Sequence, residues 1–372
     1  MKKNNIRAIS FLLLTLALSF FAARQFLLML QPELIIPSEN LTQKNLLSDY
    51  FKPLHGTRGD SDVYIFESTN PGANVLILGG THANEPAGFL AAVALIENMN
   101  VTQGKVVVIP RANNSAFTCN DPQEGNPQKF SITTSSGKRY FRFGSRSTNP
   151  IDQWPDPEVY RHFPSGQKLS GAETRNLNRS YPGKADGSLT EKIAHAITCV
   201  IKNENIDIAF DLHEASLEYP VINAIVAHPN SFEMAGECVM ELQMEGLNFN
   251  LEPSPENLRG LSHREWGDHL QVAAILMETA NPVQGRYHGK LTPDVIVSGK
   301  DKIYAEAAQH NLLEVEYPEQ GIPLNHRVGR HLAGLKTFLT VWALHNPEKN
   351  IAIENIPTFD QLLENGLGFY LN

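Results

Sequence analysis

Asn74-Val75-Leu76-Ile77-Leu78-Gly79-Gly80-Thr81-His82-Ala83-Asn84-Glu85 is the stretch from which the fold is best predicted. It begins with an apolar run that is typical of a strand buried on both faces of a parallel sheet. Two glycines end the strand, and Pro86 then starts a helical pattern, since proline suits the first helical turn. His82 and Glu85 therefore follow the carboxyl end of a strand, where open α/β sheets bind their ligands.

Further apolar runs extend this strand–helix pattern along the chain. They predict strands at residues 62–66, 105–110, 206–212, 221–227 and 272–277, and helices at 87–99, 192–203, 231–245 and 325–345. Strands that alternate with helices indicate a parallel sheet. The sequence thus predicts an α/β fold with a mixed, mostly parallel sheet flanked by helices.

Polar side chains recur at the ends of three of these strands. His82 and Glu85 follow the first, His213 follows another and Glu278 a third. Because parallel strand ends lie along one rim, these groups can converge. Two histidines and one glutamate form a known catalytic zinc set, and a second carboxylate such as Glu278 can act as general base. Considered singly, His213 could equally be a hydrogen-bonded strand-end histidine and Glu278 a solvated carboxylate.

A second polar segment reads Arg175-Asn176-Leu177-Asn178-Arg179-Ser180-Tyr181-Pro182-Gly183. A guanidinium pairs bidentately with a carboxylate, and an asparagine can hold the same group from the side. The segment therefore predicts a binding site for a substrate carboxylate next to a scissile amide. By itself it is equally compatible with a surface turn.

Composition limits the other functional classes. The chain has 372 residues, a net charge of −9, 42% hydrophobic residues and 19% charged residues, which is ordinary for a globular protein and argues against nucleic-acid binding. Cys119, Cys199 and Cys238 show neither a zinc-finger spacing nor a disulfide framework.

The N-terminus has the pattern of a targeting segment. Lys2, Lys3 and Arg7 precede the apolar residues 8–23, and after Arg24-Gln25 the apolar run resumes through Leu30. We expect a cleaved signal peptide or an uncleaved membrane anchor, and hence an exported protein that is periplasmic or attached to the membrane through residues 8–30. The predicted organisation is a leader at 1–30, a linker at 31–60, a catalytic domain at 61–346 and a C-terminal extension at 347–372.

Three motifs together resemble a known family. Gly79–Glu85, Leu177–Gly183 and Asp211–His213 are similar to signatures of the zinc carboxypeptidase superfamily, and most similar to its succinylglutamate desuccinylase/aspartoacylase branch. The resemblance covers roughly residues 63–344 and implies a carboxypeptidase-like fold with one Zn²⁺ per chain. It implies the following roles: His82, Glu85 and His213 as metal ligands, Asn178 and Arg179 as clamps for the substrate carboxylate, and Glu278 as general base.

The resemblance also implies a further arginine that stabilises the oxyanion. Arg175, Arg161 and Arg111 are all candidates, and Arg175 is favoured as a substrate-binding residue because it lies nearest the clamp.

The chain departs from the family pattern in several places. The stretch 111–171 is long, Glu214 stands where a small hydroxyl residue is common, and Glu316 is a second candidate for the base. Tyr219 and Tyr287 both remain candidates for a mobile tyrosine.

The sequence thus predicts a zinc-dependent hydrolase that cleaves an amide bond next to a free carboxylate, as a deacylase of N-acyl amino acids does. One alternative is an exported zinc carboxypeptidase that trims peptides. The other is a non-catalytic homologue that binds a metal or a ligand. The expected partner is a small carboxylate-bearing amide or peptide, without nucleic acid.

Overall fold

A computed structural model describes residues 2–121 and 124–372 of the chain. It contains two compact units, Met1–Leu34 and Ile35–Asn372. The first unit holds helix α1 (Lys2–Met29), and residues 4–29 of this helix are long and apolar enough to cross a membrane. Whether this helix acts as a signal or an anchor stays a prediction, because signal sequences and membrane spans share these properties.

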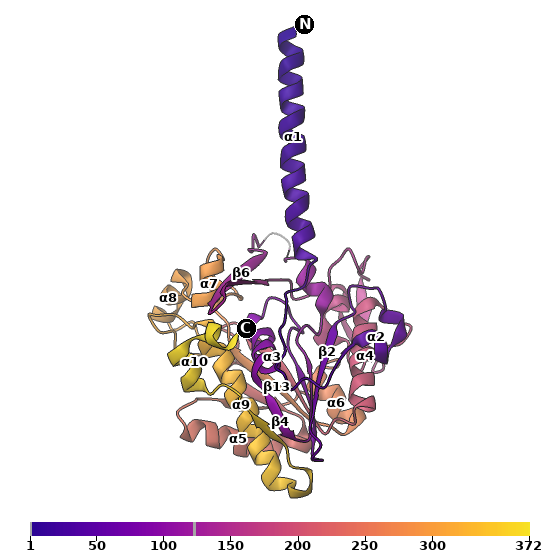
Figure 1. The fold of residues 1–372 in the computed structure, drawn as a ribbon, viewed down its shortest axis with the longest axis vertical. Helices are drawn as coiled ribbons and strands as arrows, with labels where there is room; N and C mark the ends of the chain where they lie inside the picture. The colour runs from indigo at the N-terminus through magenta and orange to yellow at the C-terminus, as the bar shows by residue number, and fades with distance from the viewer. Residues whose placement is uncertain (1, 122–123) are drawn as a thin grey trace. The chain divides into compact units, whose positions relative to one another are not determined.

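The second unit is built on an eight-stranded sheet in the order β1-β2-β5-β3-β10-β13-β11-β12. Figure 1 labels two of its strands, β2 and β13. The strands are β1 (Gln43–Leu46), β2 (Asp62–Glu67), β3 (Asn74–Leu78), β5 (Lys105–Ile109), β10 (Ile208–Ala215), β11 (Ala224–Ala227), β12 (Asn250–Pro253) and β13 (Ala273–Ala280). The four central strands β5, β3, β10 and β13 are parallel, whereas β1 and β2 at one edge, and β11 beside β13, pair antiparallel. The predicted mixed, mostly parallel α/β fold is therefore confirmed.

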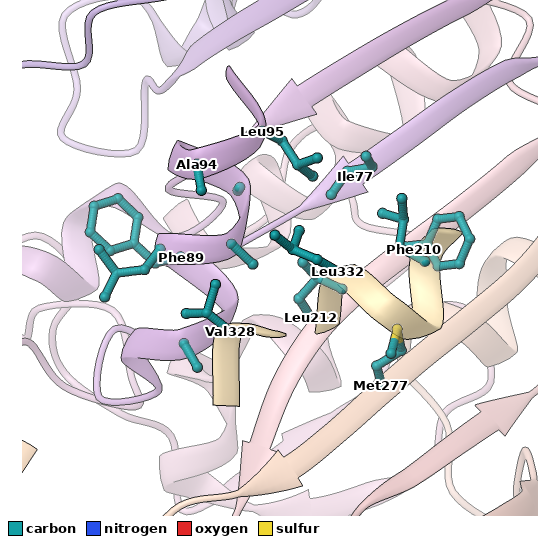
Figure 2. Close-up of a cluster of buried hydrophobic side chains, with 14 of the residues drawn as sticks. Ile77, Phe89, Ala94, Leu95, Phe210, Leu212, Met277, Val328 and Leu332 are labelled. Carbon is teal, nitrogen blue, oxygen red and sulfur yellow. The ribbon is translucent and has the colours of Figure 1, made fainter. Parts of the chain in front are cut away.

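Helices cover both faces of this sheet because its central strands are apolar on both faces. In β3, Val75 and Ile77 join a core with α3, α5 and α9, whereas Leu76 and Leu78 join a second core with α2, α4 and α6. The helices are α2 (Leu47–Tyr50), α3 (Pro86–Asn98), α4 (Leu189–Asn203), α5 (Phe232–Met244), α6 (Ser262–Leu270) and α9 (Leu324–His345). Figure 2 shows the first core, where side chains of α3 and α9 lie against Ile77, Phe210 and Met277 of the sheet.

Helix α3 packs directly against β10, and this brings the first motif to its neighbours. A Cβ atom at Gly88 would collide with the carbonyl oxygen of Leu212, so only glycine permits this approach. Glu85 is the N-cap residue of α3 and is therefore held close to β10.

Short elements form the remainder of this unit. They are the hairpins β6 (Lys129–Thr134)/β7 (Gly137–Arg142) and β8 (Val159–Arg161)/β9 (Lys168–Ser170), the pair β4 (Asn100–Gln103)/β14 (Ala352–Glu354), and the helices α7 (Pro293–Ser298), α8 (Lys302–Gln309) and α10 (Phe359–Asn365). The long stretch 111–171 thus contains two hairpins.

Two boundary regions differ from the sequence-based expectation. Residues 43–46, which we expected in a linker, form the edge strand β1. Residues 352–371, which we expected in an extension, contribute β14 to a strand pair and place Leu362 and Leu371 in the main core. Ile35–Asn372 is accordingly one compact unit.

Two strands also extend further than their apolar runs. The expected ends at residues 212 and 277 are wrong, because β10 continues to Ala215 and β13 to Ala280. His213 and Glu278 consequently lie inside these strands, as register partners across the parallel pair. Apolarity ends where polar site residues begin, but the backbone pairing continues through them.

Candidate metal and substrate site

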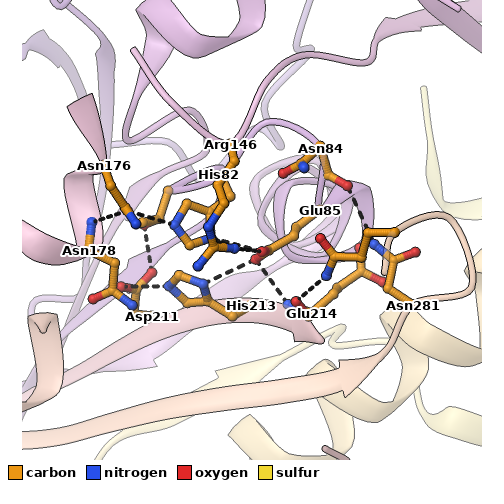
Figure 3. Close-up of polar contacts among 12 residues, drawn as sticks. His82, Asn84, Glu85, Arg146, Asn176, Asn178, Asp211, His213, Glu214 and Asn281 are labelled. Carbon is orange, nitrogen blue, oxygen red and sulfur yellow. Dashed lines mark hydrogen bonds and ion pairs between the residues drawn. The ribbon is translucent and has the colours of Figure 1, made fainter. Parts of the chain in front are cut away.

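His82, Glu85 and His213 meet at the carboxyl end of the central strands. One ligand atom from each of the three buried residues lies within 4.8 Å of the others (Figure 3). His82 and Glu85 come from the turn between β3 and α3, and His213 comes from β10. The structure thus brings together the three residues expected to be metal ligands.

The Glu85 carboxylate lies between the two imidazoles. Its Oε1 atom lies 2.8 Å from Nδ1 of His82, and its Oε2 atom lies 3.1 Å from Nδ1 of His213. The backbone N–H of Glu214 also donates a hydrogen bond of 3.0 Å to Oε2. Both histidines therefore direct the same ring nitrogen, Nδ1, towards a common centre.

The other ring nitrogens face oxygen atoms that orient the rings. Nε2 of His82 is 3.0 Å from Oδ1 of Asn176, and Nε2 of His213 is 3.0 Å from Oδ2 of Asp211. Asp211 and His213 share one face of β10 because side chains alternate along a strand. Thr81 donates a hydrogen bond of 2.7 Å to the other oxygen of Asp211. Such partners fix the tautomer of a ligating histidine, and the sequence analysis gave neither Asn176 nor Asp211 this role.

The surroundings shift the pKa values of the titratable groups in this cluster. Burial alone would raise the pKa of Glu85, but the two histidines hold it well below its usual range. Burial would lower the pKa of His213, but Asp211 and Glu85 hold it well above its usual range. Burial, helped by the positive charge of Arg146, lowers the pKa of His82 to about 4. Glu85 thus keeps its negative charge between the two imidazoles, and His213 keeps a proton that a bound cation would have to displace.

Glu278 lies next to His213 on the same side of the sheet. The two residues are register partners, and Oε2 of Glu278 has no hydrogen-bond partner among the described residues. Burial raises the pKa of Glu278 to about 8, so this carboxyl group can take up and release protons near neutral pH. Glu316, the second candidate for the base, is exposed to solvent.

Asn178 and Arg179 lie on the short helical turn Leu177–Arg179 beside the cluster. The backbone N–H of Asn178 donates to Oδ1 of Asn176, the oxygen that faces His82. Burial lowers the pKa of the Arg179 guanidinium, and nearby Glu173, Tyr219 and Glu278 partly offset this effect. The predicted clamp residues and the predicted base are therefore neighbours.

The arginine that lies at the cluster is Arg146, which the sequence analysis did not single out. Its Nη1 atom lies 3.1 Å from Oε1 of Glu85 and 3.3 Å from Nδ1 of His82, and its side chain is 43% exposed. Arg146 follows the β6/β7 hairpin within a polar stretch that has no periodic pattern. Its placement depends on tertiary contacts, so no signal in the sequence marked it.

The three arginines considered from the sequence have other surroundings. Arg175 forms two hydrogen bonds, of 2.8 and 2.9 Å, to Asp156 and a third, of 3.0 Å, to the carbonyl oxygen of Thr148. Arg111 is buried against Asp62, and Arg161 is exposed on β8. All three guanidine nitrogens of Arg175 thus serve the packing of loops, and the structure does not bring this side chain into the cluster.

The donor set fits a divalent zinc ion. Two imidazole nitrogens and one carboxylate are ligands that leave a fourth position open in catalytic zinc sites. The second nitrogen of His82 is hydrogen-bonded to Asn176, as is usual for a ligating histidine, and that of His213 lies 3.0 Å from the carboxylate of Asp211. The three ligand atoms lie within 4.8 Å of one another, close enough to contact one ion.

Comparisons with known proteins agree with the second and third of the three motifs. Residues 159–281 match the family model of the succinylglutamate desuccinylase/aspartoacylase catalytic domain, a range that includes Asn178, Arg179, His213 and Glu278. A similar protein is the N-alpha-acetyl-L-2,4-diaminobutyric acid deacetylase of Halomonas elongata, which is 27% identical over 159 residues. That match covers 42% of this chain and 33% of the relative, so it spans about a third of the relative's length.

Some solved structures are also similar to this chain, at lower sequence identity. An aspartoacylase family protein from Mesorhizobium loti is 19% identical with a TM-score of 0.36, covering 59% of this chain and 56% of that one. The apo Cell Shape Determinant protein Csd4 from Helicobacter pylori is 13% identical with a TM-score of 0.45, covering 79% and 56%.

Proposed function

We propose that this chain, whose resemblance to the succinylglutamate desuccinylase/aspartoacylase family is confirmed, is a zinc-dependent hydrolase that cleaves an amide bond next to a free carboxylate. The observation that supports this proposal most directly is the convergence of His82, Glu85 and His213 beside Glu278. A metal-ligand set with an adjacent carboxyl group is an arrangement that can hydrolyse an unactivated amide.

A zinc ion held by these three side chains would supply Lewis acidity, which lowers the pKa of water and polarises a carbonyl group. The protein's own residues would do the rest. Glu278 accepts a proton from the attacking water and returns it to the departing nitrogen. The guanidinium of Arg146 stabilises the negative charge that develops on the carbonyl oxygen, since it already lies at the cluster.

The substrate would be held through its carboxylate by Asn178 and Arg179. Burial makes the Arg179 guanidinium a strong partner for an anion, because charge pairs are less screened away from water. Together with the deacetylase relative, this favours a deacylase of N-acyl amino acids. The product that carries the departing nitrogen is then an amino acid with a free carboxylate.

A substrate panel with metal control tests the proposal. We expect zinc-loaded protein to release an acyl group from at least one N-acyl amino acid, to lose this activity after chelation, and to regain it with added zinc. Compounds in which the carboxylate of the same substrates is replaced by a carboxamide should be hydrolysed much more slowly. Preference for short peptides with free C-termini would indicate a carboxypeptidase. Full zinc occupancy without turnover of any amide would contradict the hydrolase.

A further inference from the structure

We propose that residues 260–266, the turn before α6 and the first residues of that helix, position the substrate-carboxylate clamp. We call them the clamp support, and residues 178–181 the clamp segment. The inference rests on the proposed function, because it concerns how that site holds the carboxylate of its substrate. Neither the sequence motifs nor the metal cluster includes the clamp support.

The first contact fixes the orientation of the Asn178 side chain. The backbone N–H of Ser262 donates a hydrogen bond of 2.9 Å to Oδ1 of Asn178, and both residues are buried. Ser262 is the first residue of α6, so its N–H has no acceptor within the helix. Because Oδ1 is turned towards α6, the Nδ2 group lies on the other branch of the amide. Its two N–H donors are thereby left for an acceptor such as a carboxylate.

The second contact places the backbone of Arg179. Gly260 has a φ of +84°, and a Cβ atom there would collide with the carbonyl oxygen of Arg179. The carbonyl oxygen of Gly260 also accepts a hydrogen bond of 3.3 Å from the N–H of Tyr181. Only glycine combines this backbone conformation with so close an approach.

Further contacts make the clamp support rigid. The ring of Trp266 meets that of Tyr181 edge-on, with 5.1 Å between centroids. The buried carboxylate of Glu265 accepts hydrogen bonds from the N–H of Gly260, at 2.9 Å, and from Arg259, at 2.8 Å. A binding group that is already held in place loses less entropy when a ligand binds. The clamp support therefore sets the affinity for the substrate carboxylate.

The test compares Ser262→Pro with Ser262→Ala. Proline is tolerated at the first helical position, and Leu261 before it is extended at φ −73° and ψ 137°, so the proline variant removes the N–H without breaking α6. The alanine variant loses the same hydroxyl but keeps the N–H. Both are made as full chains, loaded with zinc, in a Glu278→Gln background so that the probe is not consumed. The probes are N-acetyl-L-alanine and its carboxamide, measured by titration calorimetry.

We expect Ser262→Pro to bind the acid roughly tenfold more weakly than Ser262→Ala does. The carboxamide, which does not need the clamp, should show no such difference between the two variants. If the N–H of Ser262 had a merely structural role, Ser262→Pro would lower the thermal midpoint of unfolding. It would not weaken binding of the acid more than binding of the carboxamide. Equal acid affinities in the two variants would overturn the inference.

A second pair of variants tests the contact between Gly260 and the backbone of Arg179. Gly260→Ala and Gly246→Ala both place alanine at a positive φ, +84° and +83°, but no atom lies within 4 Å of a Cβ at Gly246. Backbone strain is therefore matched, and the collision with Arg179 is the difference. We expect weaker binding of the acid only in Gly260→Ala, and unchanged binding there would count against the clamp support.

Arg179→Ala separates this inference from the proposed function. If Arg179→Ala weakens acid binding while Ser262→Pro and Gly260→Ala do not, the clamp support fails and the proposed function stands. If Arg179→Ala leaves acid binding unchanged, the clamp itself fails, and the proposed substrate class fails with it.

Discussion

Glu278 and His213 are neighbours because they are register partners on two parallel strands. The same face of β10 also carries Asp211, which approaches the far nitrogen of His213. One strand pair thus presents a candidate metal ligand, a carboxylate beside its far nitrogen and the candidate base Glu278. This spacing follows from the two-residue period of strands, and the site depends on it.

We predict that Glu278→Gln lowers kcat by roughly 10²–10⁴-fold, because the amide cannot accept the proton from water. Zinc content should stay unchanged, since Glu278 is not among the three clustered ligands. The matched control is Glu316→Gln at an exposed position, for which we expect normal kcat. If the two variants exchanged these outcomes, Glu316 would be the base.

We further predict that Asn176→Ala weakens zinc binding about 10–100-fold, because Nε2 of His82 loses the oxygen that orients its ring. Competition with a chromophoric chelator measures the effect. Asn74→Ala is the control, since it also loses side-chain hydrogen bonds but at the opposite end of β3. Equal zinc affinities in the two variants would show that Asn176 does not orient the ligand.

At the residue scale, the sequence predicted the side chains that lie at or just beyond the ends of apolar runs, and it missed Arg146 on an irregular stretch. His82, Glu85, His213 and Glu278 could be found because apolar strands end near them. Arg146 could not be found, since the stretch that carries it has no pattern that records its three-dimensional position. Proximity in sequence pointed to Arg175 instead, whose guanidinium is bound by Asp156.

Three elements are joined behind the candidate site by a buried ion pair. Glu214 of β10 and Arg327 of α9 lie 2.8 Å apart, both with fully buried side chains. The Glu214 carboxylate also accepts the backbone N–H of Ala87 in the first turn of α3. Glu214 therefore has a packing role in this chain. Its side chain points to the face opposite His213 and joins β10 to both helices.

Removing one partner of this pair leaves the other charge buried without compensation. We therefore predict that Arg327→Met lowers the free energy of unfolding by about 3–5 kcal/mol. Arg161→Met, at an exposed position on β8, should change it by less than about 0.5 kcal/mol. Urea denaturation of the two variants provides the comparison, and a similar small loss in both would mean that the buried pair is dispensable.

At the element scale, periodicity predicted the central strands and the helices that cover them. The predicted run 74–78 is β3 itself, and the helix predicted at 325–345 is α9, which begins one residue earlier. The short strands at the edges of the fold were not predicted. The hairpins within 111–171 and the edge strand β1 are too short, and too polar on their exposed positions, to produce a periodic signal.

For the whole molecule, buried neutral histidines link stability to pH. Burial lowers the pKa of His263 and of His331 to about 3 each, and that of His326 to about 4. In the unfolded chain these groups titrate near pH 6.5. Below that pH these three histidines bind more protons in the unfolded state than in the folded state, so their contribution to stability is complete above about pH 6.5 and falls as the pH decreases.

We predict that His331→Gln flattens this dependence between pH 6.5 and 4. One histidine contributes at most about 1.4 kcal/mol per pH unit to the slope. Urea denaturation at several pH values, for the natural chain and for the variant, measures the change. Parallel curves for the two proteins would show that His331 is not a source of acid sensitivity.

Residues 8–30 lead to a prediction about attachment. Helix α1 has the length and composition of a membrane span, and we infer that it exports or anchors the chain. Full-length protein expressed in a bacterium should then appear in the periplasm without its leader, or in membranes and be released by detergent but not by salt. Recovery of uncleaved protein in the soluble cytoplasmic fraction would contradict this inference.

The most direct test of the central claim is the zinc content of purified protein, measured by mass spectrometry together with amide hydrolysis. We predict one zinc ion per chain, and the loss of both zinc and hydrolysis in His82→Ala and in His213→Ala. Full zinc occupancy in either variant, or hydrolysis by zinc-free protein, would contradict the assignment of His82, Glu85 and His213 as the metal site.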